Sequence, residues 1–395
     1  MEERLKFIVE ARGGVAGIAE LARAYGVSRK TAYKWLGRYQ EAGTPGLLER
    51  SRAPHSMPWA VPEEVAALIV ALRKRRPTWG PRKLLAALAG EQLGIKLPAA
   101  STVAALLSRR GLVVHRRRAR RTPLYQGPFT ACRAANQVWC ADFKGHFLLG
   151  NHRVCHPLTI TDAFSRYLLR CEGLSRTGEP DVRPQFDSAF REFGLPEAIR
   201  TDNGAPFATT APAGLSKLAI WWVKLGIRPE RIEPGKPTQN GRHERFHRTL
   251  QQETAAPPAA TMAAQQRAFD DFRVVYNDER PHEALGQHPP ASKYTPSARS
   301  YPTKLKEPEY GDEAEVRRVR PKGQVKWRGQ EVFVSEALRG EPVGIVEVAD
   351  GQWAVHFGPL LLGHFDDKGR FNRPRPGKRP SQVATEVKVS PMSPG

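Results

Sequence analysis

The sequence predicts a multidomain α+β chain: N-terminal all-α units, a central α/β mixed sheet and a C-terminal small β-barrel. Apolar residues recur at helical spacing as far as about residue 112, and strand and helix patterns alternate from about residue 136. Short alternating segments separated by Gly or Asp then run from about residue 316 to 371. With 395 residues, 40% of them hydrophobic, the chain is long enough for several cores.

The charge of the chain points to a polyanionic partner. A formal net charge of +22 favours nucleic acid or an anionic membrane surface. No apolar run approaches the roughly 18 to 20 residues of a membrane-spanning helix, and the N-terminus does not resemble a signal peptide. We therefore expect a cytoplasmic protein that binds nucleic acid. The four cysteines form no C-x-x-C pair, so we expect reduced thiols rather than a zinc or redox motif.

Residues 1–56 are predicted to form a helix-turn-helix DNA-binding domain. Two apolar stripes, beginning at Ile18 and Val27, flank a turn with Gly26, and Ser28 is suited to cap the second helix. An ordinary helical hairpin with a solvated basic face is the alternative. The exposed residues of the second helix are basic and aromatic, which favours DNA binding. These predicted contacts are Arg29, Lys30, Tyr33, Lys34 and Arg38.

Residues 57–114 predict a second helix-turn-helix-like domain with a weaker DNA-contact signal. Three apolar stripes predict three helices, the last capped by Ser101. A basic linker at residues 115–129 follows, where a solvated linker and a phosphate-tracking arm are both open readings. Its position beside the two helical domains favours the arm. Its arginines are Arg116, Arg117, Arg118, Arg120 and Arg121.

Residues 130–298 predict the mixed sheet with helices on its faces, in the order β-β-β-α-β-α-β-α. In "VWCADFKGHFLL", Trp139 and Ala141 fall on one face of a strand, and Cys140 and Asp142 on the other. Residues 310–372 predict the small barrel, which we expect to bind DNA, and residues 373–395 a disordered tail rich in Pro, Lys and Ser.

Three acidic residues have positions that call for an explanation. Asp142 lies within an apolar strand, where an unpaired ion costs several kcal/mol. Asp202 follows a strand and precedes Asn-Gly, at a sheet edge that can bind ligands. Glu244 projects away from the apolar stripe of a basic helix. Each could form an ordinary ion pair or turn. Together, however, they offer oxygen ligands suited to two Mg²⁺ or Mn²⁺ ions, which serve phosphodiester chemistry.

Five segments of the chain resemble, in order, the blocks of the retroviral-type integrase catalytic core of insertion-sequence transposases. They are "NQVWCADF", "TITDAFSRYLL", "IRTDNGAPF", "LGIRPERIEPGKPTQNGRHERFHRTL" and "YNDERPHEALG". The resemblance implies an RNase H-like fold and a metal-binding catalytic triad of Asp142, Asp202 and Glu244. It also implies that Asn240 and Gly241 form the turn before the catalytic helix. His247 and Arg248 would lie near substrate phosphates, and Asp162 would be a strand-end acid outside the metal site.

The implied function is DNA transposition, with metal-dependent 3′-end cleavage and strand transfer. Its partners would be terminal inverted repeats, target DNA and further copies of the chain, and its place the bacterial nucleoid. A nuclease that cuts without joining, or a DNA-binding regulator with an inactive core, are the alternatives. One departure from the family pattern is that 41 residues separate Asp202 from Glu244, more than is usual.

Overall fold

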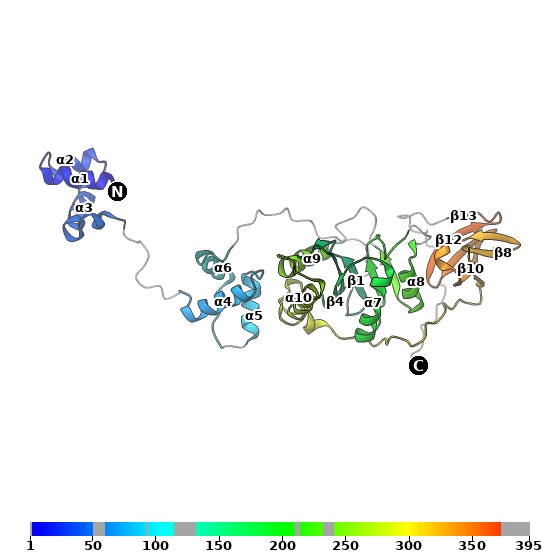
Figure 1. Cartoon of the computed structure of the whole chain (residues 1–395). Coiled ribbons are helices and arrows are strands. Elements are labelled where there is room, and N and C mark those ends of the chain that lie inside the picture. The colour runs from blue at the N-terminus through cyan, green and yellow to red at the C-terminus, as the bar shows by residue number, and fades with distance from the viewer. Residues whose placement is uncertain are drawn as a thin grey trace. The chain divides into compact units, whose positions relative to one another are not determined.

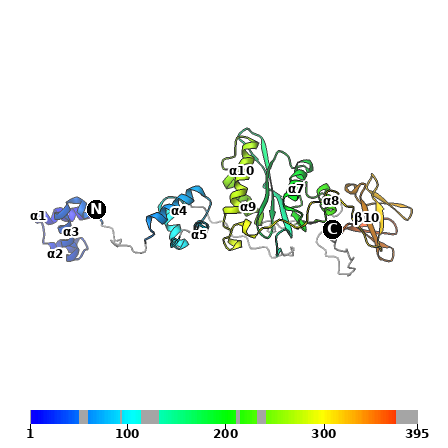
Figure 2. The same cartoon turned by 90° about the horizontal axis from the view of Figure 1, so that it is seen from below.

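The computed structural model describes residues 2–49, 60–91, 94–113, 132–209, 214–231 and 241–372, without the side chains of 241 and 242. The predicted basic linker, the residues just before the helix of Glu244 and the predicted tail largely lie outside these ranges. The chain divides into two compact units, Met1–Pro62 and Glu63–Gly395. Figures 1 and 2 show their secondary structure.

The first unit is a three-helix domain, in which α2 and α3 are the two helices predicted on either side of the Gly26 turn. Its core is built from Phe7, Ile8, Leu21, Ala22 and Leu47, together with Ala32. The predicted cap is confirmed, because the Ser28 hydroxyl accepts a hydrogen bond from the backbone N–H of Thr31 at 3.2 Å. The elements are α1 (Glu2–Gly13), α2 (Ile18–Ala24), α3 (Arg29–Ala42) and the 3-10 turn η1 (Thr44–Leu47).

The second unit begins with three further helices, α4 (Glu63–Arg75), α5 (Pro81–Gly90) and α6 (Ala100–Arg109). Their buried residues follow the predicted stripes, with Ile69, Leu84 and Val103 fully buried. The predicted cap at Ser101 is wrong, because α6 begins one residue earlier and has no side-chain cap. A helix fixed by its apolar face needs no cap to form.

A mixed sheet follows, with strands in the order β2-β3-β1-β5-β6 and β4 also paired with β3. The pairs β1–β3, β2–β3 and β3–β4 are antiparallel, whereas β1–β5 and β5–β6 are parallel. This is the mixed sheet predicted from the sequence. The strands are β1 (Val138–Phe143), β2 (Phe147–Leu148), β3 (Val154–Asp162), β4 (Leu168–Leu174), β5 (Ala198–Thr201) and β6 (Arg228–Arg231).

Helices cover both faces of this sheet, with α7 and α8 on one side and α9 and α10 on the other (Figures 1 and 2). On the α7 side, Trp139 and Ala141 pack with Phe186 and Phe190. On the α9 side, Phe246 and Leu250 pack with residues of β4 and α10. The helices are α7 (Glu179–Phe193), α8 (Lys217–Lys224), α9 (Gly241–Thr254) and α10 (Met262–Val274); η4 (Val275–Glu279), η5 (Glu283–Leu285) and η6 (Pro290–Lys293) follow.

The C-terminal strands form a five-stranded sheet, β13-β12-β11-β10-β7, and a separate β8–β9 hairpin. Closure of the small barrel predicted from the sequence is not shown among the described residues. Instead, hairpin and sheet enclose one apolar core that includes Trp327, Trp353 and Phe365. The elements are β7 (Glu315–Arg318), β8 (Gln324–Trp327), β9 (Gln330–Phe333), η7 (Glu336–Leu338), β10 (Pro342–Ala349), β11 (Gln352–Phe357), β12 (Leu360–Asp366) and β13 (Phe371–Asn372).

Helix α8 is buried on two sides. Leu218, Trp221 and Trp222 belong to the core of the mixed sheet, whereas Ile220 and Val223 belong to the core of the C-terminal strands. A helix that is apolar all round is a buried helix. It therefore packs the central and C-terminal sheets together. None of the described helices is long and apolar enough to span a membrane.

Candidate active site

Asp142 lies in β1 on the face covered by α9. It is 9% exposed and pairs across the antiparallel ladder with Thr159 of β3, so the two side chains share a face. The Thr159 hydroxyl donates to the backbone carbonyl of Asp142 at 3.1 Å. The predicted alternation of β1 is confirmed, because Trp139 and Ala141 belong to the core on the opposite face.

Asp202 follows β5 directly, at the same level of the sheet as Asp142. Strands β1 and β5 are parallel, and their register pairs Cys140 with Arg200. Two residues further along both chains, this register sets Asp142 opposite Asp202 on strands about 4.8 Å apart. Asp202 is partly exposed and accepts a hydrogen bond from the backbone N–H of Gly204 at 3.2 Å.

Two histidines hold α9 against this face of the sheet. His247 Nε2 lies 2.9 Å from the Thr159 hydroxyl, and His243 Nε2 lies 3.3 Å from the Thr161 hydroxyl. The two imidazoles stack, with ring centroids 5.7 Å apart. Sequence reasoning did not identify His243, Thr159 or Thr161 as site residues. The spacing of four in "HERFH", which places both histidines on one helix face, could have indicated the pair.

Glu244 is exposed on α9 next to these histidines. On a helix it lies about 160° around the axis from Phe246. Phe246 packs on Phe272 of α10 and Tyr276 of η4, and α10 covers β4 through Gln266, whose amide donates to the Cys171 carbonyl. Strand β4 and strand β1 lie on opposite sides of β3. The flank of α9 that carries Glu244 is therefore the one nearer Asp142 and Asp202.

The donor set at this end of the sheet consists of oxygen ligands, which suit Mg²⁺ or Mn²⁺. Asp142, Asp202 and Glu244 would supply carboxylate oxygens, the ligand type that such an ion prefers. Among the residues that the structure describes, however, no group of three or more His, Cys, Asp and Glu side chains is arranged to hold a metal ion. Residues 232–240, which connect β6 to α9, are outside that description.

The environment of His247 does not suit the phosphate contact expected of it. Its side chain is 6% exposed, and burial lowers its pKa to about 3, with His243 and Lys144 adding to the shift. Burial likewise lowers the pKa of His243 to about 4. Both imidazoles are thus neutral at pH 7 and bind hydroxyls of β3.

The other predicted DNA contacts divide by location. Arg248 is exposed on α9, and Gly241 is the first residue of that helix. Asn240 lies outside the described residues, as do Arg116, Arg117, Arg118, Arg120 and Arg121. On α3, Arg29, Lys30, Tyr33 and Lys34 are exposed and Arg38 is partly exposed.

Asp162 has a structural environment, in keeping with its predicted place outside the metal site. It is 1% exposed and accepts hydrogen bonds from the backbone N–H groups of Asn136 and Ser165 and from the Ser165 hydroxyl, at 2.6 to 2.8 Å. Asn136, at a positive φ of 65°, also accepts from Trp139 Nε1 and Tyr294 Oη. This buried network fixes the start of β1.

Sequence models of known families match most of the chain. Two models of the integrase core domain match residues 133–237 and 225–290. A helix-turn-helix domain matches residues 3–55, and a homeodomain-like domain matches residues 31–107. The C-terminal domain of IS481 family transposases matches residues 314–370. The matched ranges follow the order of the units described above.

Two relatives are encoded by insertion elements. The chain is 32% identical over 231 residues to the IS407 uncharacterized 31.7 kDa protein of Burkholderia multivorans, covering 58% of this chain and 80% of that protein. It is 35% identical over 180 residues to the IS476 uncharacterized 39.2 kDa protein of Xanthomonas euvesicatoria, covering 45% of this chain and 49% of that protein.

Among solved structures, the HTLV-2 integrase catalytic core domain in complex with magnesium is 15% identical to this chain. The match covers 41% of this chain and 99% of that domain, with a TM-score of 0.32. At that score the strand order and register of the chain itself, rather than the match, define its central sheet.

Proposed function

This chain belongs to the insertion-sequence transposases with an integrase core domain, and from that premise we propose that it cleaves the 3′ ends of an insertion sequence and joins them to target DNA. The observation that supports the proposal is the register of β1 and β5, which pairs Cys140 with Arg200, so that Asp142 and Asp202 each follow this pair by two residues. Glu244 completes the proposed triad from the flank of α9 nearer to both.

The reaction consists of two phosphodiester exchanges. In the first, water adds to phosphorus at the element end and a 3′-hydroxyl leaves; in the second, that hydroxyl attacks a target phosphodiester in line and a 3′-hydroxyl of the target strand leaves. Asp142, Asp202 and Glu244 would hold two Mg²⁺ ions, or Mn²⁺ in their place, which when bound supply Lewis acidity. Neutral His243 and His247 hold α9, and with it Glu244, at a fixed distance from β3. The contribution of the protein is therefore positioning and charge stabilisation.

DNA binding is assigned to the flanking domains. We propose that α3 reads the terminal inverted repeats through Arg29, Lys30, Tyr33, Lys34 and Arg38. The arginines at 116–121 and Arg248 would follow phosphates, and the C-terminal strands would hold DNA with little sequence preference. A pair of element ends requires more than one copy of the chain, so we propose a homo-oligomer on DNA. Acting on chromosomal DNA, it would work at the bacterial nucleoid.

A strand-transfer assay with Mn²⁺ and oligonucleotides carrying the element ends tests this function. Joined products are expected. Cleavage without joining would instead support a nuclease, and binding without either reaction a DNA-binding regulator.

The triad is tested by Asp142→Asn, Asp202→Asn and Glu244→Gln, each of which removes one charge with little change of shape. We expect each to abolish cleavage and joining while end binding changes less than about threefold, since the proposed contacts to DNA lie elsewhere. The control is Glu283→Gln, at a carboxylate that is 79% exposed and distant in sequence from the triad. Activity retained by any triad variant removes that residue from the site.

A further inference from the structure

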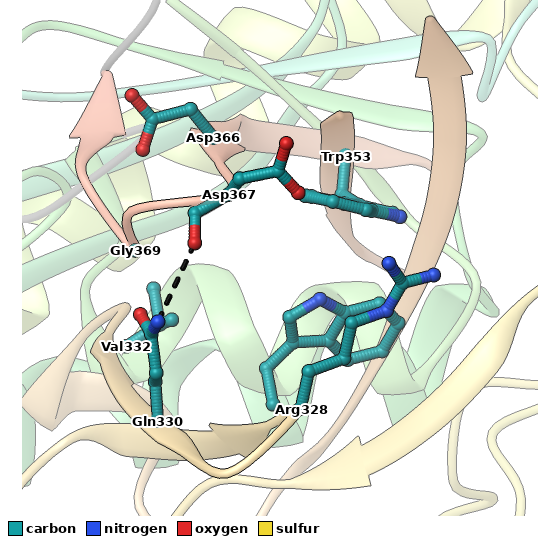
Figure 3. Close-up of a pocket in the computed structure, with 8 residues that line it drawn as sticks. Arg328, Gln330, Val332, Trp353, Asp366, Asp367 and Gly369 are labelled. Carbon is teal, nitrogen blue, oxygen red and sulfur yellow. Dashed lines mark hydrogen bonds between the residues drawn. The ribbon is translucent and has the colours of Figure 1, made fainter. Parts of the chain in front are cut away.

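A small hollow lies where the β8–β9 hairpin meets the five-stranded sheet (Figure 3). Its enclosed volume is about 20 Å³, room for about one water molecule. A larger group can therefore enter only when a lining side chain moves aside. Figure 3 shows Trp353 and Asp367 on one side of the hollow and Arg328 and Gln330 on the other.

One wall of the hollow is aromatic, and a single movable side chain covers it. The Arg328 guanidinium lies 4.7 Å from the ring centroid of Trp353 and 5.8 Å from that of Trp327. Trp353 is 2% exposed, whereas Arg328 is exposed and has no hydrogen bond or ion pair within the described residues. Rotation of Arg328 would therefore uncover part of the Trp353 indole, whose other contacts include Trp327 and Phe365.

The hollow is lined by groups of positive and of negative charge, which restricts the charge that a ligand can carry. Asp367 offers a carboxylate without a partner in the described part of the chain and Gln330 an amide, while Asp366 is held by Arg370 at 2.9 Å. Trp327 is 6% exposed, and its indole N–H is a buried donor with no partner among the described residues. A phosphate would face Asp367, and a cation would face Arg328. A neutral planar group with both donors and acceptors meets neither repulsion.

We propose that this hollow binds an unpaired nucleobase of the DNA substrate, an inference that rests on the proposed function. The base would stack on Trp353, accept a hydrogen bond from Trp327 Nε1 or Arg328, and donate its exocyclic amine to Asp367. Bases within a duplex are already stacked and cannot enter. The site therefore distinguishes distorted or melted DNA from an intact duplex.

The exchange of Arg328 for a base is favourable in magnitude. The 4.7 Å separation leaves no room for a base between Arg328 and Trp353, so the arginine must swing aside or stack on the outer face of the base. An exposed cation–π contact is worth about two- to fivefold in binding. Stacking of a base on an aromatic side chain is worth about five- to 150-fold.

The test compares binding of the full chain to two duplexes of one sequence, the second with a single unpaired cytosine, by fluorescence anisotropy. We expect the second to bind about tenfold more tightly, within the range for stacking. Arg328→Ala should raise that preference by at least about threefold, because the side chain that covers the stacking face is removed. Asp367→Asn should reduce the preference for unpaired cytosine over unpaired thymine, which lacks the amine.

The matched control is Arg317→Ala. Arg317 stacks on Trp327 at 5.7 Å but does not line the hollow. It should alter both duplexes equally and leave the preference intact. Equal binding of the two duplexes by the native chain overturns the base site while leaving DNA binding in place. A chain that binds neither duplex refutes DNA binding by the protein itself. Millimolar deoxycytidine should reduce the preference, because the free nucleoside competes with the unpaired base for the same stacking face.

Discussion

The two N-terminal helical domains are both small three-helix domains rich in basic residues, yet they use those residues differently. On α3, Arg29, Lys30, Tyr33 and Lys34 are exposed and form no side-chain hydrogen bond or ion pair within the described residues. In the second domain, basic residues around α5 form ion pairs and hydrogen bonds with other parts of the chain. Basic composition alone therefore does not separate the proposed DNA-binding surface of α3 from a docking surface that binds another part of the same chain.

The docking surface joins the turn before α5 to the end of α9 and the segment after α10. Arg76 pairs with Glu279 at 2.6 Å, and Arg82 with Glu283 at 3.2 Å. The Thr78 hydroxyl donates to Glu253, and Lys83 donates to the Pro281 carbonyl. Glu253 also pairs with the buried Arg280 at 2.5 Å. The nearby acids are what convert this basic surface into an internal contact.

Acidification should produce the largest difference in stability between the two compact units, Met1–Pro62 and Glu63–Gly395. Burial lowers the pKa of His243 to about 4 and those of His247 and His282 to about 3, whereas the first unit contains no histidine within its described residues. Because the folded state binds fewer protons than the unfolded state, stability present above about pH 6.5 is lost as pH falls. Thermal melts from pH 7 to 5 should lower the transition of the second unit and barely move that of the first. An equal fall of both transition temperatures would contradict the assignment of this pH dependence to the buried histidines of the second unit.

Removing the exposed cations of α3 should have the next largest effect. The triple variant Arg29→Ala, Lys30→Ala, Lys34→Ala should bind element ends about 1,000-fold more weakly, with a salt slope reduced by about three. The matched triple variant Arg76→Ala, Arg82→Ala, Lys83→Ala should lose at most about threefold, because those side chains already have partners. Salt-dependent binding isotherms measure both. Equal losses of affinity in the two triple variants would show that the basic residues of both domains contribute equally to DNA binding.

Glu253→Gln should lower the free energy of unfolding of the second unit. Arg280 is 8% exposed, so removing its partner leaves a buried charge, at a cost of about 3 kcal/mol. The free energy of unfolding of the second unit, from urea titration, should fall by that amount while the first unit is unchanged. A loss below about 0.5 kcal/mol would show that the pair of Glu253 and Arg280 contributes little to the stability of the second unit.

Arg82→Ala should have the smallest effect. Arg82 and Glu283 are 74% and 79% exposed, so their ion pair is worth less than about 1 kcal/mol and is screened by salt. The same urea titration should detect little or no change. A larger loss would mean that this contact is more enclosed in solution than its exposure implies.

Local patterns predicted much of the fold. The alternation in β1 and the cap at Ser28 depend on neighbouring residues, and both are confirmed. Features set by distant residues were not predicted. The small barrel was predicted from the number of strands, which does not determine how edge strands pair, so the five-stranded sheet with a separate hairpin was not foreseen. The contact of Arg76 with Glu279 joins residues far apart in sequence, which one sequence read locally does not reveal.

The candidate site shows the same division. Asp142, Asp202 and Glu244 were predicted from position and from resemblance, and the strand register brings the first two to one level of the sheet. The roles of His243 and His247 were missed, because their hydroxyl partners lie on β3, more than 80 residues earlier. A basic helix suggested phosphate contacts for His247, whereas burial makes its ring neutral.

Helix α8 has a practical consequence for anyone dividing this chain into fragments. It lies in the long interval between Asp202 and Glu244, yet Ile220 and Val223 on its outer side are covered by the C-terminal strands. Lys224 also pairs with Glu341 at 2.9 Å. A catalytic fragment ending near residue 298 would leave that apolar side open to water and would tend to aggregate. Expression boundaries should therefore keep the catalytic and C-terminal sheets on one polypeptide.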